Sequence, residues 1–296
     1  MAGRKFFALL LLLNSVPLFA ATLSVPEIYP TVQEAIDAAD EGDIVDIAPG
    51  VYEESLVLRG GITIAGRGEL PEDVALEGLI EHPIAELRDD TRLLILKNMR
   101  LRNGFAVHGG GLYLENARVK LDRVEFWGCG SMLEGGAIFA RNVDLEAEFC
   151  VFFLNYSWGA DGAALFVEGQ GPLGEGQKFQ NCTFAGTSLC CGNASIYMLA
   201  TSPLISNCIL ELMRCGAGAF PYLTCNNGEF CGIDGGGHIP GGAFFCNLYE
   251  GELHLRDESF CLPQNSGGCG LIGALGQCLD QSATESISFS LLKTLY

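Results

Sequence analysis

The chain of 296 residues carries 36 acidic and 17 basic side chains, a formal net charge of −19. Such an acidic excess argues against nucleic acid and acidic polymers as direct partners, because like charges repel. Hydrophobic residues make up 49% of the chain, which argues against disorder and indicates a large buried interior.

The first 21 residues have the features of a secretory signal peptide. Arg4 and Lys5 provide a positive start, residues 6–13 are apolar, and small residues surround position 21. The apolar stretch is too short for a membrane span, and no later stretch is long enough for one. We therefore expect an exported mature chain with 15 basic residues (17 − 2) against 36 acidic ones.

Residues 29–39 predict a short amphipathic helix. Thr31 and Glu34 have the spacing of a capping box. One apolar face of this helix consists of Val32, Ala35, Ile36 and Ala39. A stack of β-strands has an open end with unpaired edges, so we expect the helix to cap that end.

A four-residue phrase recurs between residues 96 and 210. Its occurrences start 25, 26, 32 and 26 positions apart, at Asn98, Arg123, Phe149, Asn181 and Asn207. An insertion at residues 169–176 explains the longer step. Within each unit, apolar residues alternate over short stretches that end at Gly, Asn or Asp, which is typical of strands joined by turns. The repeat predicts an all-β solenoid, a parallel β-helix whose coils stack roughly 4.8 Å apart.

Stacking at this period brings equivalent residues into columns. The predicted inward column consists of Val124, Cys150, Cys182 and Cys208, with an aromatic stack of Phe126, Phe152 and Phe184 beside it. On the outside, Arg118 is expected beside Asp144 and Lys120 beside Glu146, each pair worth about 0.2–1 kcal/mol. The outward row of the repeated strand is expected to read Arg100, Glu125, Val151, Thr183 and Ile209.

The stretch before the repeat, YPTVQEAIDAADEGDIVDIAPGVYEESLVL followed by ITIAGRG, carries a family resemblance. It resembles the N-terminal cap and first coils of the pectin-lyase-like right-handed β-helix superfamily, in which pectin methylesterases and many non-enzymatic bacterial surface proteins begin this way. The match covers residues 29–68, and the periodic body extends it to residue 210. It implies a right-handed parallel β-helix with an N-terminal capping helix, and it implies no activity, because these residues only build coils.

We expect one elongated domain of nine or ten coils over residues 22–280. The cap and first coil occupy residues 22–50, regular coils occupy residues 51–210, and a cysteine-rich end occupies residues 211–280. Residues 281–296 form a C-terminal extension with no predicted fold.

Nine of the thirteen cysteines lie after Cys190. In an exported chain such a cluster predicts disulfides. The tail resembles a closing motif of cysteine-rich secreted bacterial β-helix proteins, which implies the pairs Cys261–Cys269 and Cys246–Cys278. A shorter loop related to the same proteins implies Cys225–Cys231. The cysteines of the inward column are interpreted as buried thiols rather than disulfides, and an odd total leaves at least one thiol free or paired with another chain.

Enzymes on this fold act from an outer face where acids and bases of adjacent coils meet. An esterase needs two aspartates and an arginine, a lyase needs a Ca²⁺ site and a base, and a glycosidase needs paired carboxylates. The best acidic column is Asp122 beside Glu148, flanked by Lys120 and Arg123, and we interpret it as solvated ion pairs. The glycosidase-like triplet Asn142–Asp144 receives the same interpretation, because Asp144 is expected to face Arg118.

The remaining candidates are histidines and aromatic residues. His108 and His238 adjoin glycine runs and have no second ligand at metal-binding spacing, so both are interpreted as turn residues, and the glycines as tight corners. Tyr113 and Phe139 either form an exposed aromatic strip that stacks on sugar rings or pack inward, with inward packing favoured.

The sequence therefore predicts a non-catalytic exported protein, secreted or at the cell surface, that serves adhesion or carbohydrate binding. It predicts no catalytic, cofactor or metal residues, and its expected partners are an extracellular polysaccharide or a surface protein. The alternative is a polysaccharide lyase or carbohydrate esterase, with Asp122, Glu148 and Arg123 as candidates and Ca²⁺ as a cofactor of the lyase. A third hypothesis is that the chain is the passenger of a larger surface protein.

Overall fold

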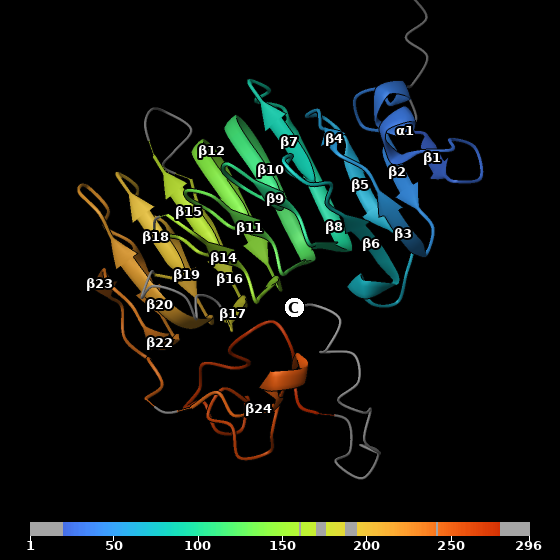
Figure 1. The fold of residues 1–296 in the computed structure, drawn as a ribbon. Helices are drawn as coiled ribbons and strands as arrows, with labels where there is room; N and C mark the ends of the chain where they lie inside the picture. Colours follow the sequence, from blue (N-terminus) through green and yellow to red (C-terminus); the bar gives the residue numbers. More distant parts are fainter. Residues whose placement is uncertain (1–19, 160, 170–175, 187–193, 241, 279–296) are drawn as a thin grey trace, which may run out of the picture.

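A computed structural model describes residues 20–159, 161–169, 176–186, 194–240 and 242–278 (Figure 1). The protein is mainly β, with long all-parallel sheets and few helices. Parallel pairing links twenty strands into one sheet, a second parallel sheet has the order β14–β11–β9, and β24 and β25 form an antiparallel pair. The predicted signal peptide, except its last two residues, and the C-terminal extension lie outside the described residues, as do Cys190 and Cys191.

The N-terminal part begins with a strand and a short capping helix. The Thr31 Oγ1 accepts a hydrogen bond from the Glu34 N–H at 3.1 Å, and Val32, Ala35 and Ile36 are buried. The helix packs on β1, β2 and β4 at one end of the sheet, so the predicted amphipathic helix is present there. The elements are β1 (Thr22–Val25), α1 (Val32–Ala38), β2 (Ile44–Ile47), β3 (Gly50–Glu53), β4 (Leu56–Val57), β5 (Thr63–Gly66), η1 (Pro71–Asp73), β6 (Val74–Glu77), β7 (Ala85–Arg88) and β8 (Leu93–Arg102).

The middle and C-terminal parts contain the remaining strands. The middle strands are β9 (Phe105–Ala106), β10 (Leu112–Trp127), β11 (Gly130–Ser131), β12 (Ile138–Glu148), β13 (Val151–Phe153), β14 (Tyr156–Ser157), β15 (Leu165–Glu168), β16 (Lys178–Gln180) and β17 (Thr183–Ala185). The later elements are β18 (Ile196–Leu199), β19 (Leu204–Ser206), β20 (Ile209–Cys215), β21 (Tyr222–Thr224), β22 (Asn227–Glu229), β23 (Ile233–Asp234), β24 (Phe245–Asn247), η2 (Leu248–Glu250) and β25 (Glu252–Leu255). Figure 1 shows the parallel strands side by side, from the blue end near α1 to the orange end at β23.

The register of the repeated strand is the predicted one. Arg100 pairs with Glu125, then Val151, Thr183 and Ile209 follow in one row. The first residue of every repeated phrase has a positive φ, between 51° and 56°, at Asn98, Arg123, Phe149, Asn181 and Asn207. Asparagine tolerates this left-handed conformation better than most residues, which explains why it returns at this corner.

The core columns are also as predicted. Val124, Cys150, Cys182 and Cys208 are fully buried, and the three cysteines are free thiols. The rings of Phe126 and Phe152 stack with centroids 5.0 Å apart, and those of Phe152 and Phe184 at 4.3 Å. The thiols thus act as small hydrophobes in a buried interior.

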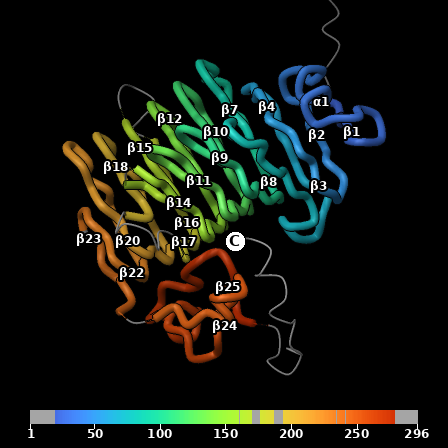
Figure 2. Tube along the Cα trace, viewed as in Figure 1, coloured from blue at the N-terminus to red at the C-terminus, as the bar shows by residue number. Residues whose placement is uncertain are grey.

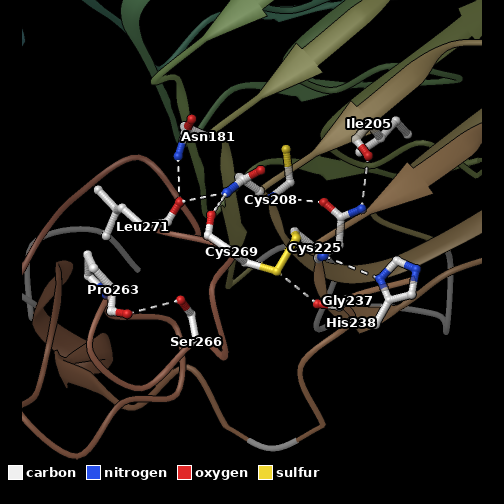
Figure 3. Close-up of a disulfide and its surroundings, with 12 residues drawn as sticks. Asn181, Ile205, Cys208, Cys225, Gly237, His238, Pro263, Ser266, Cys269 and Leu271 are labelled. Atoms are coloured by element: carbon white, nitrogen blue, oxygen red, sulfur yellow. Dashed lines mark hydrogen bonds between the residues drawn. A yellow bond between two sulfur atoms is a disulfide. The ribbon is translucent and has the colours of Figure 1, made fainter. Parts of the chain in front are cut away.

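The disulfides differ from the predicted set in two of three pairs. Cys246–Cys278 is confirmed, but Cys225 bonds Cys269, 44 residues away, and Cys215 bonds Cys231. The predicted pairs Cys261–Cys269 and Cys225–Cys231 are therefore wrong. Cys261 is a buried free thiol in the apolar centre of the C-terminal segment. Cys269 bonds Cys225, at the end of strand β21, instead (Figure 3).

Residues 243–278 form a compact C-terminal lobe that lies against the parallel strands (Figure 2). Leu253 of the lobe packs on Val151 and Phe153, and Ile272 packs on Ile209. Hydrogen bonds join the two parts: the Asn181 side chain donates to the Leu271 carbonyl at 2.7 Å, and the Ala274 N–H donates to Thr183 Oγ1 at 2.9 Å. Figure 3 shows the asparagine and the Cys225–Cys269 bond at this junction.

The predicted outward row is therefore not a solvent-exposed face. The lobe leaves Glu125, Val151, Thr183 and Ile209 with exposed fractions of 6%, 2%, 1% and 5%. Burial raises the pKa of Glu125, although Arg100 Nη2 lies 2.6 Å from its carboxylate. The row faces away from the main core, as expected, but a second hydrophobic layer covers it.

Candidate functional site

The acidic column proposed for an enzyme does assemble. Asp122 lies directly beside Glu148 in the register of β10 and β12. Arg123 Nη2 is 3.5 Å from the Asp122 carboxylate, and the ammonium groups of Lys120 and Lys178 are 3.3 and 3.5 Å from Glu148. The carboxylates are thus paired with cations on a partly solvated face, as the sequence predicts.

The predicted surface ion pairs of the neighbouring positions are present as well. Arg118 Nε lies 3.3 Å from Asp144, and Lys120 Nζ lies 3.8 Å from Glu146. Exposed pairs of this kind contribute little to stability, typically up to about 1 kcal/mol. Asp144 therefore serves as an ion-pair partner of Arg118.

Tyr113 and Phe139 belong to a ladder of four stacked rings. The ladder runs across β10, β12, β15 and β18 through Tyr113, Phe139, Phe166 and Tyr197, with centroids 5.2, 5.3 and 5.7 Å apart. These residues alternate with core residues of the same strands, so they project from the opposite face. Phe139 is nevertheless only 1% exposed, because its two faces meet neighbouring rings. The strip points outward, but its inner rings cannot stack on a ligand.

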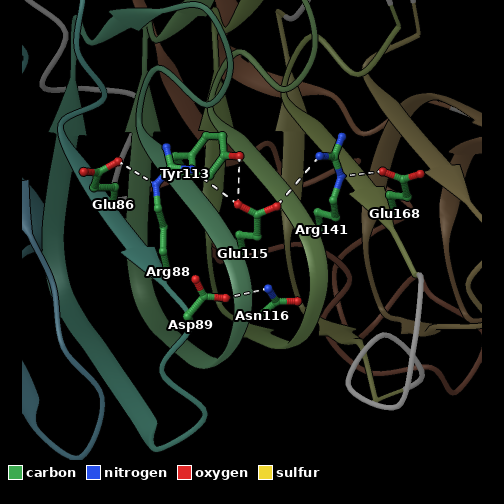
Figure 4. Close-up of polar contacts among 8 residues, drawn as sticks. All are labelled: Glu86, Arg88, Asp89, Tyr113, Glu115, Asn116, Arg141 and Glu168. Atoms are coloured by element: carbon green, nitrogen blue, oxygen red, sulfur yellow. Dashed lines mark hydrogen bonds and ion pairs between the residues drawn. The ribbon is translucent and has the colours of Figure 1, made fainter.

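A row of alternating charges runs beside the ring ladder (Figure 4). Arg88, Glu115, Arg141 and Glu168 face one another across four strands, with Arg88–Glu115 at 3.3 Å and Arg141–Glu168 at 2.7 Å. The Arg88 guanidinium also lies 3.8 Å from the centre of the Tyr113 ring. The charges neutralise one another, and Arg88 covers the Tyr113 ring, so these side chains serve the packing of the sheet surface.

The ring ladder ends in an open depression of about 530 Å³. Its apolar floor is formed by Phe166, Tyr197 and Leu199, and its polar wall by Glu134, Asp161 and Arg214. Arg214 Nη1 donates to Asp161 Oδ1 at 3.0 Å. The depression therefore offers an aromatic surface with carboxylate acceptors and a guanidinium donor around it.

A partly exposed aromatic face adjoins the depression on the β9–β11–β14 sheet. Phe105, Gly130 and Tyr156 are in register, and a Cβ at Gly130 would lie 2.3 Å from the Tyr156 ring. The glycine lets that ring lie over β11 and approach Phe105, at 6.2 Å between centroids. Trp158 is 62% exposed and its ring centre is 4.9 Å from that of Phe105. Gly159, the next residue, already lines the depression.

The histidines occupy different surroundings. His108 Nδ1 lies 2.8 Å from the Glu134 carboxylate at the edge of the depression, and its ring packs on Phe139 at 4.8 Å. His238 Nδ1 accepts a hydrogen bond from the Asn226 N–H at 3.3 Å, beside the Phe230 ring. Across the described ranges of the chain, no three His, Cys, Asp or Glu side chains are grouped so that they could hold a metal ion.

The aromatic face formed by Phe105, Tyr156 and Trp158 is not among the features predicted from the sequence. A signal was present, because Phe105, Gly130 and Tyr156 are spaced by 25 and 26 residues, the period of the main repeat. The strands concerned are only two residues long, so alternation could not reveal them.

The three disulfides of the later strands and the C-terminal lobe suggest an oxidising environment. In the described part of the chain, no helix is both long and apolar enough to cross a membrane. No protein-family model matches the chain, and no curated protein matches its sequence.

Proposed function

We propose that the protein is an exported right-handed parallel β-helix of the pectin-lyase-like type that binds carbohydrate without catalysis. The parallel register with steps of 25 and 26 residues and the helix at the sheet's first end support the fold. Right-handed connection is the rule for parallel strands. The signal-peptide features and the disulfides support a secreted or cell-surface location.

The observation that carries the binding proposal is the exposed Trp158, directly before Gly159, which lines the depression. Sugar rings have apolar C–H faces that pack on aromatic rings, and hydroxyls that need donors and acceptors. Trp158 and Phe105 supply the first surface, while Glu134, Asp161 and Arg214 supply the polar groups. Because Gly159 joins the two, one oligosaccharide can contact both.

The charge of the site selects among glycans. Two carboxylates and one guanidinium line the depression, in a chain with a net charge of −19. A uronate polymer would meet this acidic surface at a Coulombic cost, whereas a neutral hexose chain would not. Neutral glycans are therefore the proposed ligands, with adhesion as the cellular role.

The test is affinity measurement on immobilised neutral and acidic glycans with the oxidised full chain. Trp158→Ala should weaken binding to the recognised glycan at least about tenfold, as expected for an aromatic anchor. The matched control is Tyr249→Ala, because Tyr249 is 94% exposed on the C-terminal lobe, away from the site. Equal loss in both variants, or no loss with Trp158→Ala, would reject this site.

The enzymatic alternative rests on the direct pairing of Asp122 with Glu148 beside Arg123. A polysaccharide lyase or esterase would release unsaturated ends or methanol from pectin, and the lyase would need Ca²⁺. Asp122→Asn and Glu148→Gln should abolish any such turnover if this column is the catalytic site. Turnover that survives both substitutions would exclude the column.

A further inference from the structure

Trp158 belongs to a row of exposed apolar side chains that crosses the β9–β11–β14 sheet. The register of β11 with its two neighbours places Met132 between Val107 and Trp158. The Met132 N–H donates to the Ala106 carbonyl at 2.9 Å, which continues this register past the strand ends. The Trp158 N–H likewise donates to the Ser131 carbonyl at 3.0 Å. Val107, Met132 and Trp158 are 50%, 45% and 62% exposed, so the row presents an apolar surface to water.

A second row runs beside the first, two residues earlier on each strand. Ile80 pairs with Phe105, and Gly130 and Tyr156 follow in the same register. Because Gly130 has no side chain, the rings of Phe105 and Tyr156 approach each other over it, with centroids 6.2 Å apart. Ile80, at the far end of this row, is 81% exposed. We call the side chains of both rows the apolar strip: Ile80, Phe105, Val107, Met132, Tyr156 and Trp158.

The apolar strip leads into the depression. Gly159 follows Trp158 and lines the depression, as does Glu134, two residues after Met132. In the other direction the strip continues to Ile80 and crosses four successive coils. At the usual strand spacing this is about 14 Å, roughly the length of three sugar units in an extended chain. A single ligand can therefore contact the polar groups of the depression and the whole strip.

The charges around the apolar strip favour a glycan chain over a membrane as its ligand. Apolar surfaces that bind lipid carry Lys and Arg at their edges, which attract anionic headgroups. Here Glu81 directly follows Ile80, Glu134 lies near Met132, and the chain has a net charge of −19. A neutral sugar chain meets no such repulsion, because it packs its C–H faces on apolar side chains and keeps its hydroxyls in water.

We propose that the ligand of this site is a linear neutral oligosaccharide of at least about four sugars, with one end in the depression and its length along the apolar strip. The assignment rests on the proposed glycan-binding function and specifies the length and direction of the ligand. Ile80 and Val107 lie at the end of the strip remote from Trp158, so they contact only those sugars that a short ligand lacks. The affinity should therefore rise with chain length until the strip is filled.

Calorimetric titration of the oxidised full chain with cello-, manno- and xylo-oligosaccharides, from di- to hexasaccharides, tests the proposal. In a series that binds, the hexasaccharide should bind at least about tenfold more tightly than the disaccharide. Ile80→Ala/Val107→Ala should remove most of this gain and leave the affinity for the disaccharide unchanged. Trp158→Ala should weaken binding at every length, because Trp158 lies where the strip meets the depression.

The matched control is Val51→Ala/Val57→Ala, which truncates two valines 55% and 61% exposed near the first end of the sheet. It should bind every length like the wild type, and circular dichroism should show the same folded signal for all variants. Equal affinity for all lengths, with binding still lost in Trp158→Ala, would overturn the role of the strip and leave the glycan site standing. Binding of none of the three series would overturn both. Binding to phosphatidylcholine vesicles that Ile80→Ala/Val107→Ala abolishes would make the strip a lipid-binding surface instead.

Discussion

Replacing Phe152 with alanine tests the stacking of the core directly. The Phe152 ring is fully buried between the rings of Phe126 and Phe184, at 5.0 and 4.3 Å. Truncation of a buried phenylalanine costs about 3–5 kcal/mol, through lost transfer energy and the cavity that remains. Each aromatic pair is worth about 0.5–1.5 kcal/mol more. We therefore expect Phe152→Ala to lower the free energy of unfolding by about 5 kcal/mol.

The two outer rings of this stack provide a built-in comparison. Phe126 and Phe184 are as deeply buried as Phe152, but each has a single stacked neighbour in this column. Their alanine variants should each cost about 1 kcal/mol less than Phe152→Ala, the value of one aromatic pair. Tyr249→Ala, at a 94% exposed position, should be neutral.

The assay is equilibrium denaturation in urea, followed by tryptophan fluorescence and circular dichroism, with every variant oxidised. A cost for Phe152→Ala below about 2 kcal/mol would refute the reasoning, because no buried, stacked ring can be lost so cheaply without a different register. An equal cost at all three positions would refute the stacking contribution alone.

Three further predictions concern the C-terminal lobe and one carboxylate. Cys225→Ser/Cys269→Ser removes a loop closure of 44 residues, so it should lower the free energy of unfolding by about 4 kcal/mol and make the lobe sensitive to limited proteolysis. Thr183→Val leaves the Ala274 N–H without its acceptor and should lower the free energy of unfolding by about 1–3 kcal/mol. Thr183→Ser keeps the hydroxyl and should retain most of that stability. The Arg92 guanidinium lowers the pKa of Asp90 to about 2, below the ordinary value of about 3.9. The resulting stabilisation is present above about pH 4 and is lost as the pH falls through about 2, so Asp90→Asn should cost about 1–2 kcal/mol at pH 7 and nothing below pH 2, by urea denaturation.

The register of the sheet could be predicted because its cause is local and repeated. Strand alternation and the period of the phrase place Arg118 beside Asp144 and Phe126 beside Phe152, and both neighbours are found in the structure. A one-residue slip would turn every core side chain outward, so the pattern leaves no freedom.

The C-terminal lobe could not be predicted by the same reasoning. Its contact between Ala274 and Thr183 spans 91 residues and follows no period, and the lobe itself contains no repeat of the phrase. Two of the disulfide predictions are wrong for the same reason. Cys269 is close to Cys261 in sequence, but the fold of the lobe places Cys269 against Cys225 on the sheet. Pairing of cysteines depends on three-dimensional proximity, which spacing alone does not determine.

The row of Glu125, Val151, Thr183 and Ile209 under the C-terminal lobe is relevant to whether this protein can act on polysaccharides as an enzyme. A general acid in a glycan-active site needs a carboxyl group with a raised pKa. Burial raises the pKa of Glu125, but that residue lies under the C-terminal lobe, 6% exposed, with Arg100 against it. The half-buried pair Asp122 and Glu148 instead forms ion pairs with three cations at 3.3–3.5 Å. Acid catalysis at Glu125 would require the lobe to leave the sheet, against the Cys225–Cys269 disulfide and a hydrophobic contact. The aromatic face needs no such opening, which supports the proposal of binding without catalysis.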